Sequence, residues 1–79
     1  MPHSEYRTPN LSLSAVLLHK GQKLRSLDRH TSRDAEFIFE DSAELQEIVS
    51  SYWRDDLLCP AQSLLSSLRR AKHILYDSP

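Results

Sequence analysis

Glycine and cysteine are almost absent from this sequence of 79 residues, which contains one of each. A phosphate-binding loop needs several glycines because its backbone must approach the phosphates closely, so this class of nucleotide site is excluded. The single Cys59 cannot form an internal disulfide, which is typical of a reducing compartment. The four histidines and Cys59 are scattered and form no paired ligand motif, so we expect no metal and no cofactor.

Long hydrophobic runs are also missing from the chain. The longest apolar run covers residues 15–18, which is far too short to cross a lipid bilayer. The N-terminal residues lack the apolar segment of a secretory signal peptide. We therefore expect a soluble cytoplasmic protein, folded as one domain because 79 residues suffice for a single small core.

Net charge is small as well, since ten basic and eleven acidic residues give a formal charge of −1. This balance excludes a general nucleic-acid coat protein, which needs a clear basic excess. The charges are nevertheless unevenly distributed. Residues 1–35 contain six basic and three acidic side chains, residues 36–58 one and seven, and residues 59–79 three and one. This split predicts either an acidic helix packed beside basic elements, or acidic and basic faces used in self-association or partner binding.

The stretch from residue 37 to residue 53 carries the clearest structural signal. Phe37 and Phe39 are strong strand formers, and the alternation of side chains places both on one face. Apolar residues then recur at i, i+3, i+4, i+7 and i+8, which predicts an amphipathic helix over residues 42–54. The apolar stripe of this helix consists of Leu45, Ile48, Val49, Tyr52 and Trp53.

The remaining elements follow from the single glycine, the prolines and shorter apolar patterns. Asn10 or Ser12 can cap a helix that Gly21 ends, since a lone glycine after an apolar helical run favours the left-handed position behind the helix. Pro60 suits the first turn of a last helix, because its missing amide hydrogen is not needed there. The predicted segments are an edge strand at 6–8, a helix at 11–20, a bulged strand at 22–29, its antiparallel return at 34–40, and a final helix from residue 60.

The predicted fold class is therefore α+β. We expect a small antiparallel sheet of two or three strands, covered on one face by three helices, in the order (β)-α-β-β-α-α. Residues 1–7 are expected to be disordered or frayed and residues 77–79 to form a C-terminal tail. This leaves residues 8–76 as the single domain.

An ordered series of motifs runs through the predicted domain. It comprises Thr8, Asn10, Leu11, Leu13, Leu17, Leu18, Gly21 and Leu24, then Phe37, Phe39, Glu40, Asp41, Glu44, Leu45, Tyr52 and Trp53, and finally Leu68, Lys72, Leu75 and Tyr76. The series resembles a family of small bacterial and archaeal proteins that are classed as a domain of unknown function. Asn10 stands where that pattern usually has aspartate, and Cys59 replaces a usual polar cap. The resemblance implies a compact α+β domain and no established activity.

The acidic cluster of Glu40, Asp41 and Glu44 has two interpretations. Asp41 and Glu44 have the spacing of a capping box, and all three carboxylates surround the positive end of the predicted helix dipole. The alternative is a general acid–base pair or a cation site that these residues form together with Glu47. Because capping and the helix dipole already account for the first three residues, we expect no catalytic residue and a protein that is not an enzyme.

Two surfaces are candidates for binding a macromolecule. Tyr52 and Trp53 form either a core tryptophan beside a boundary tyrosine or, together with Tyr76, an aromatic anchor for a partner. The basic residues would contact a nucleic-acid backbone if they converge on one face. They are Lys20, Lys23, Arg25, Arg69, Arg70 and Lys72. The sequence thus predicts a non-catalytic accessory domain that binds a protein or forms a homodimer, with a nucleic-acid-binding accessory protein as the alternative.

Overall fold

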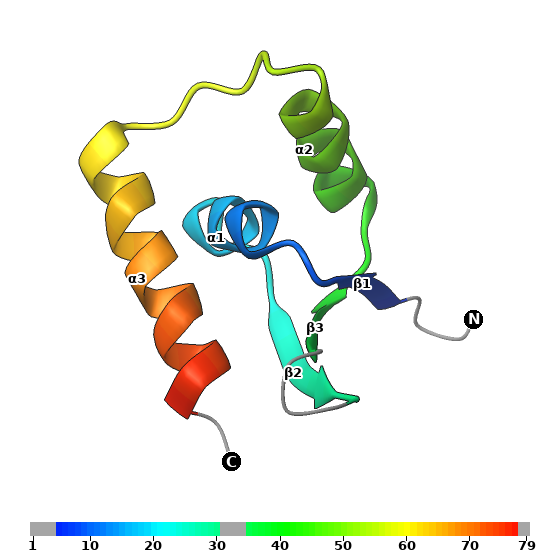
Figure 1. The fold of residues 1–79 in the computed structure, drawn as a ribbon. Helices are drawn as coiled ribbons and strands as arrows, with labels where there is room; N and C mark the ends of the chain where they lie inside the picture. The colour runs from blue at the N-terminus through cyan, green and yellow to red at the C-terminus, as the bar shows by residue number, and fades with distance from the viewer. Residues whose placement is uncertain (1–4, 31–34, 78–79) are drawn as a thin grey trace.

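The computed structural model, which describes residues 5–30 and 35–77, arranges three helices and a three-stranded sheet around one core (Figure 1). The elements are β1 (Glu5–Thr8), α1 (Leu11–His19), β2 (Leu24–Arg29), β3 (Ala35–Glu40), α2 (Ala43–Trp53) and α3 (Ala61–Asp77). The predicted α+β class and element order are confirmed, and the short first strand is present. None of the helices in the described ranges combines the length and the hydropathy that a membrane crossing requires.

The sheet is organised around β3, which pairs antiparallel with β1 along one edge and with β2 along the other. Phe37 and Phe39 of β3 belong to the buried core, as their alternation predicted. Ile38 between them lies on the outer face, where Arg7 and Ser26 are its neighbours on the adjacent strands. The predicted irregularity of β2 is present as a shift of register between Leu24 and Ser26.

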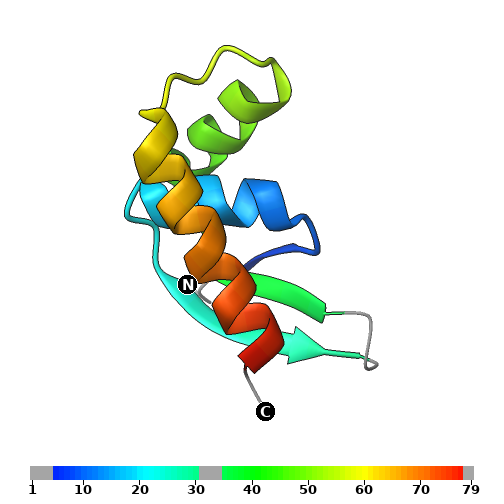
Figure 2. The same cartoon turned by 60° about the vertical axis from the view of Figure 1, so that its left-hand side comes forward.

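The core forms where α1 packs on the inner face of the sheet. Leu13 and Leu17 of α1 are buried in one hydrophobic cluster with the two phenylalanines of β3. The other two helices add Leu45, Val49 and Ala71 to this cluster. α1 lies between α2 and α3 (Figure 1), and α3 runs past the sheet with its last turn beside β2 (Figure 2). α1 therefore separates the two other helices.

Both ends of α1 are held by the residues that the sequence indicated. Asn10 Oδ1 accepts a hydrogen bond from the amide of Leu13 at 3.0 Å, which satisfies one donor of the first turn. Gly21 has a φ of 80° and follows the capping residue Lys20. The Gly21 amide donates to the Leu18 carbonyl at 3.1 Å, and the amide of the next residue donates to the Leu17 carbonyl at 3.0 Å. These two bonds form a Schellman motif.

The predicted capping box at the start of α2 is wrong. Ser42, one residue later than expected, is the N-cap, and its hydroxyl accepts the amide of Leu45 at 3.0 Å. Asp41 instead accepts a hydrogen bond from the side-chain amide of Gln46 at 2.9 Å. Glu44 lies in the first turn, where its negative charge interacts favourably with the positive end of the helix dipole. Aspartate and serine cap helices almost equally well, and the extended backbone of Ser42 decides between them.

The predicted ends of the domain also need correction, because β1 begins at Glu5 and α3 includes Asp77. Residues 5–7 therefore belong to the sheet, and residues 1–4 lie outside the described ranges. Tyr6 packs against the core, and burial, with a smaller contribution from the charge of Asp41, raises the pKa of its hydroxyl. At the other end, the guanidinium of Arg29 donates to the Leu75 carbonyl, which ties the last turns of α3 to β2.

We expect Gly21→Ala to reduce the free energy of unfolding by about 1 kcal/mol, because an L-residue is strained at a φ of 80°. No heavy atom lies within 4 Å of the added Cβ position, so this cost comes from the backbone alone. Gly21→Asn is the matched control and should lose less, since asparagine tolerates the left-handed region. Urea denaturation of the three proteins gives the comparison. An alanine variant as stable as the wild type would contradict this account of the turn.

Candidate functional site

The apolar side of α3 is wider than the surface that α1 covers. Ala71 is the only buried residue between positions 61 and 76. The leucines and isoleucine of the same side remain only partly buried against the core, namely Leu64, Leu68, Ile74 and Leu75. Since apolar surface left in water is unfavourable, this side of α3 is the first part of the molecule to consider as a binding surface.

A groove runs between α2 and α3, with α1 as its floor. One hollow of about 140 Å³ is lined almost entirely by apolar atoms of Ser12, Ala15, Val16, Tyr52, Leu64, Leu65 and Leu68. A second hollow of about 400 Å³ is lined by Val16, Tyr52, Asp55, Leu57, Cys59 and Leu64, beside the connector between α2 and α3. The two hollows share three residues and adjoin. We call the residues of both hollows the interhelical groove.

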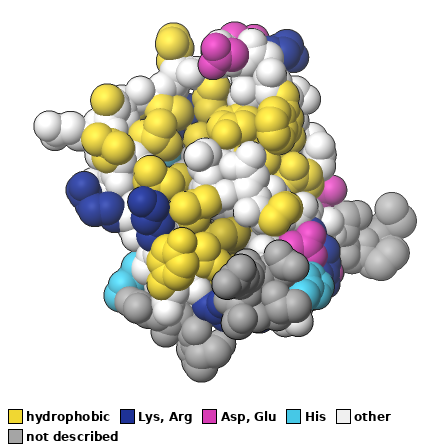
Figure 3. Space-filling model, viewed as in Figure 1, with side chains coloured by type: hydrophobic (Ala, Val, Ile, Leu, Met, Phe, Trp, Pro, Cys, Tyr) yellow, Lys and Arg dark blue, Asp and Glu magenta, His cyan; other side chains and the backbone are white. Residues whose placement is uncertain are grey.

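Hydrophobic side chains are exposed on α2, on the connector and on α3, and one of them, Leu65, lines the interhelical groove. The large ones are Trp53 with 63% of its surface exposed, Leu58 with 87%, Leu65 with 53% and Tyr76 with 71%. Figure 3 shows hydrophobic side chains gathered over α2 and α3 on the face that looks onto the N-terminal end of α1. Large apolar residues that flank a hollow are typical of protein interfaces, where they become anchors on binding.

The aromatic residues predicted as a partner surface are divided between the lining and the edge of the groove. Tyr52 is half-buried and lines both hollows, whereas Trp53 is largely exposed and meets the Tyr52 ring edge-on with centroids 5.0 Å apart. The interpretation of Trp53 as a core residue is therefore wrong. Adjacent residues point about 100° apart on a helix, and Tyr52 takes the inward position. Tyr76 lies on α3 and is exposed.

The sequence analysis did not name Leu65 as a candidate binding residue and did not group it with Arg69, Lys72 and Tyr76. Leu65, Arg69, Lys72 and Tyr76 are spaced at i, i+4, i+7 and i+11, so they follow one side of α3. All four are exposed, and Leu65 places this side next to the groove. We call these four residues the α3 stripe. The spacing was visible in the sequence, but the side of the helix that α1 leaves uncovered was not.

The six basic residues considered for nucleic-acid contact lie in three parts of the fold. Lys20 lies at the end of α1, where its ammonium donates to the Leu58 carbonyl at 3.4 Å and shares a shallow hollow with Glu44 and Glu47. Lys23 and Arg25 lie before and within β2, whereas the other three are on α3. Because Lys20 is beside the acidic residues of α2, the fold does not gather the six cations into one separate basic face.

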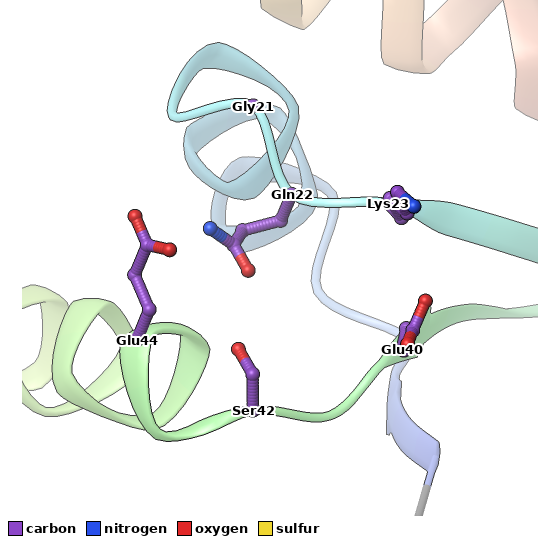
Figure 4. Close-up of a pocket in the computed structure, with 6 residues that line it drawn as sticks. All are labelled: Gly21, Gln22, Lys23, Glu40, Ser42 and Glu44. Carbon is purple, nitrogen blue, oxygen red and sulfur yellow. The ribbon is translucent and has the colours of Figure 1, made fainter. Parts of the chain in front are cut away.

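A polar hollow of about 230 Å³ lies between the turn after α1 and the start of α2 (Figure 4). Gln22, Ser42 and Glu44 point toward it, and Lys23 and Glu40 lie at one end. This is where two of the three carboxylates of the predicted acidic cluster are found. The Ser42 hydroxyl already accepts the Leu45 amide there, so its role in the hollow is that of a helix cap.

The outer face of the sheet carries a second feature that the sequence analysis missed. Arg7 Nη1 lies 2.8 Å from Asp28 Oδ2 and 3.6 Å from Glu36 Oε1, and His30 Nε2 lies 2.9 Å from the same glutamate oxygen. We call these four residues the ion-pair cluster. Asp28 lies in β2 with Glu36 as its partner across the ladder, and His30 directly follows the end of β2, two positions after Asp28.

The ion-pair cluster changes the proton affinity of its members. The hydrogen bond from Arg7 lowers the pKa of Asp28, and the hydrogen bond to Glu36 raises the pKa of His30, with Asp28 adding to the effect. Donor atoms of Asp28, His30 and Glu36 lie within 4.8 Å of one another, close enough to share one cation. The Arg7 guanidinium already provides positive charge at this place, so a metal ion would have to displace it.

The fold and the groove together define a class of protein, a small α+β domain with an apolar groove between two helices. The chain belongs to the family described as a domain of unknown function (DUF5659), whose model matches residues 3–77. The resemblance to a domain-of-unknown-function family is thus confirmed. No curated protein and no solved structure matches the chain significantly.

We expect the fold to lose stability as the pH rises through the pKa of His30. This pKa is raised in the folded state above its ordinary value of 6.5, so protonation favours folding. The contribution is complete below pH 6.5 and disappears as the pH passes the higher, folded-state pKa. His30→Gln should remove this dependence, because glutamine can still donate to Glu36 but does not titrate. Urea denaturation across the range measures both proteins, and parallel stability curves would refute the role of His30.

Proposed function

We propose that this domain is a non-catalytic protein-binding module whose binding surface is the interhelical groove. The observation that carries the proposal is the incomplete cover of α3, which leaves Leu65 exposed at an apolar hollow and Tyr76 exposed further along the same helix. Desolvation of such side chains by a partner is favourable at about 25 cal/mol for each Å² of apolar surface removed from water.

The composition of the groove supports a protein partner over a small polar ligand. The smaller hollow is lined mainly by leucine, valine, alanine and the ring of Tyr52. Small-molecule sites combine apolar walls with a few convergent polar groups that fix the orientation of the ligand. Here the smaller hollow is almost entirely apolar, whereas the larger one has polar and apolar atoms in about equal shares, with Asp55 and Cys59 in its lining. Exposed apolar anchors around a shallow apolar depression suit another protein surface better.

Nucleic-acid binding, the alternative suggested by the sequence, gains no support from the positions of the cations. A backbone-binding surface needs several lysines and arginines on one face, so that phosphates are neutralised together. Lys20 instead lies beside Glu44 and Glu47 of α2, and Arg69 and Lys72 of α3 belong to the exposed α3 stripe that begins at Leu65. A charged edge around an apolar centre is the usual arrangement at protein interfaces.

Site-specific photocrosslinking in cells of the source organism tests this proposal. When Leu65 is replaced by p-benzoylphenylalanine, irradiation should give a covalent adduct with a protein, because this position borders the groove. Ser26 is the matched control, since it is exposed on the opposite face of the sheet. No protein adduct from position 65, or equal yields of the same adducts from both positions, would contradict the proposed binding surface.

A further inference from the structure

The basic side chains of α3 have no acidic partners in the part of the chain that the structure describes. Between residues 61 and 76, α3 contains Arg69, Arg70 and Lys72 and no carboxylate. None of the three forms an ion pair with a residue in the described ranges. The Arg69 guanidinium donates a hydrogen bond to the hydroxyl of Ser66 at 3.3 Å, which leaves its charge in place. This helix therefore presents positive charge that the described residues do not pair.

Two of these cations lie between exposed apolar side chains. Arg69 and Lys72 belong to the α3 stripe, whose ends are Leu65 and Tyr76. Helical geometry keeps all four within an arc of about 60° and spreads them over about 16 Å of the helix. Figure 3 shows basic side chains beside hydrophobic ones over α3, and the acidic side chains visible in that view lie away from them. The stripe thus presents an apolar group, two positive charges and an aromatic ring in sequence.

We propose, building on the function proposed above, that the partner is an acidic amphipathic helix of another protein, which lies along the α3 stripe. Its carboxylates pair with Arg69 and Lys72. Its apolar side chains cover Leu65 and Tyr76 and enter the smaller hollow of the groove, which Leu65 lines. The charge pairs set the orientation of the two helices, whereas the apolar contacts supply most of the affinity.

A helix fits this surface better than an extended peptide. An extended segment binds best by adding to the edge of a sheet, where its backbone finds hydrogen-bond partners. The backbone of α3 uses its amides and carbonyls in its own hydrogen bonds, so the stripe offers an extended segment only side chains. A helical partner satisfies its own backbone, and about three of its turns match the 16 Å length of the stripe.

Carboxylates on a protein fit the stripe better than the phosphates of a nucleic acid. A nucleic-acid backbone is held by several cations that neutralise phosphates together. The stripe contains two, and Arg70 points about 100° around the helix from Arg69. The exposed Leu65 and the apolar hollow beside it need apolar groups from the partner. An amphipathic helix carries such groups next to its carboxylates.

Mapping two photocrosslinks by peptide mass spectrometry tests the nature of the partner. p-Benzoylphenylalanine at position 65 and, in a second protein, at position 76 should crosslink in cells to one segment of the same protein. The two sites in that segment should be about 11 residues apart if it is helical, against about five if it is extended. At least two aspartates or glutamates should lie between them.

Other mapped outcomes reject the acidic helix. A segment without carboxylates, or sites about five residues apart, would overturn the inference. So would an adduct with a second copy of this chain, or an adduct that nuclease treatment removes and that is therefore a nucleic acid.

Fluorescence anisotropy with a synthetic peptide of the mapped segment and the purified full chain tests the role of charge. Arg69→Glu combined with Lys72→Glu should weaken binding at least about tenfold, because both attractive pairs become repulsive. Arg25→Glu combined with Arg70→Glu is the matched control. It changes the net charge equally at exposed positions outside the stripe and should weaken binding less than about threefold. Equal weakening by both double variants would contradict the inference.

A charge exchange keeps the test decisive if the glutamate variant is weakly folded. A second peptide has lysine in place of the two carboxylates. It should bind the wild type at least about tenfold more weakly than the acidic peptide does, and it should bind the Arg69→Glu, Lys72→Glu protein more tightly than the acidic peptide does. Arg69→Gln combined with Lys72→Gln retains good helix formers and should bind both peptides about equally. A wild type that does not distinguish the two peptides would reject the acidic partner.

These results separate the two proposals. If position 65 is crosslinked to a protein whose binding does not depend on the charge of the stripe, the groove binds protein and the acidic-helix inference fails alone. If position 65 gives no protein adduct in cells, both proposals fail.

Discussion

The packing of α1 on the central strand positions the rest of this molecule. Leu13 and Leu17 of α1 meet Phe37 and Phe39 of β3 in a cluster from which water is almost completely excluded. Burial of each such side chain contributes about 1.5–3 kcal/mol, so these four residues represent much of what a small core can supply. β1 and β2 pair with β3 on its two sides, and the turn at Gly21 connects α1 to β2. These connections hold α1 against the inner face of the sheet.

The same packing creates the groove. α1 is a short helix of nine residues, and it lies between α2 and the seventeen-residue α3. A short helix cannot cover the whole apolar side of a long one, so part of α3 remains in water while Ala71 and its neighbours reach the core. The packing of the short α1 between α2 and α3 therefore forms the core and also leaves part of the apolar side of α3 exposed to water.

Charge is used differently on the two sides of the molecule. On the outer face of the sheet, Arg7, Asp28, Glu36 and His30 balance one another across three strands, so this face needs no partner to neutralise it. On the helical side, Glu44 and Glu47 of α2 share a hollow with Lys20 at the end of α1, and Asp56 of the connector is paired with Arg54. Arg69 and Lys72 of α3 instead lie in the exposed α3 stripe between Leu65 and Tyr76.

Local signals in the sequence determined the elements of this protein. Asn10, Gly21 and the alternation of Phe37 and Phe39 each act through neighbouring backbone or through the pleat, so α1, its end and β3 could be predicted from the chain alone. The tertiary structure decided the cap of α2, where Ser42 and not Asp41 accepts the Leu45 amide and Asp41 is bonded to Gln46 instead.

The candidate site and the ion-pair cluster depended on the tertiary structure entirely. The exposure of Trp53 and the uncovered side of α3 depend on how much surface α1 can cover, which no local pattern encodes. Arg7 and Asp28 are 21 positions apart and meet only because β1 and β2 pair with the same strand. Side chains distant in sequence come together through the order of strands and the packing of helices, whereas caps, turns and periodicity are properties of a few adjacent residues.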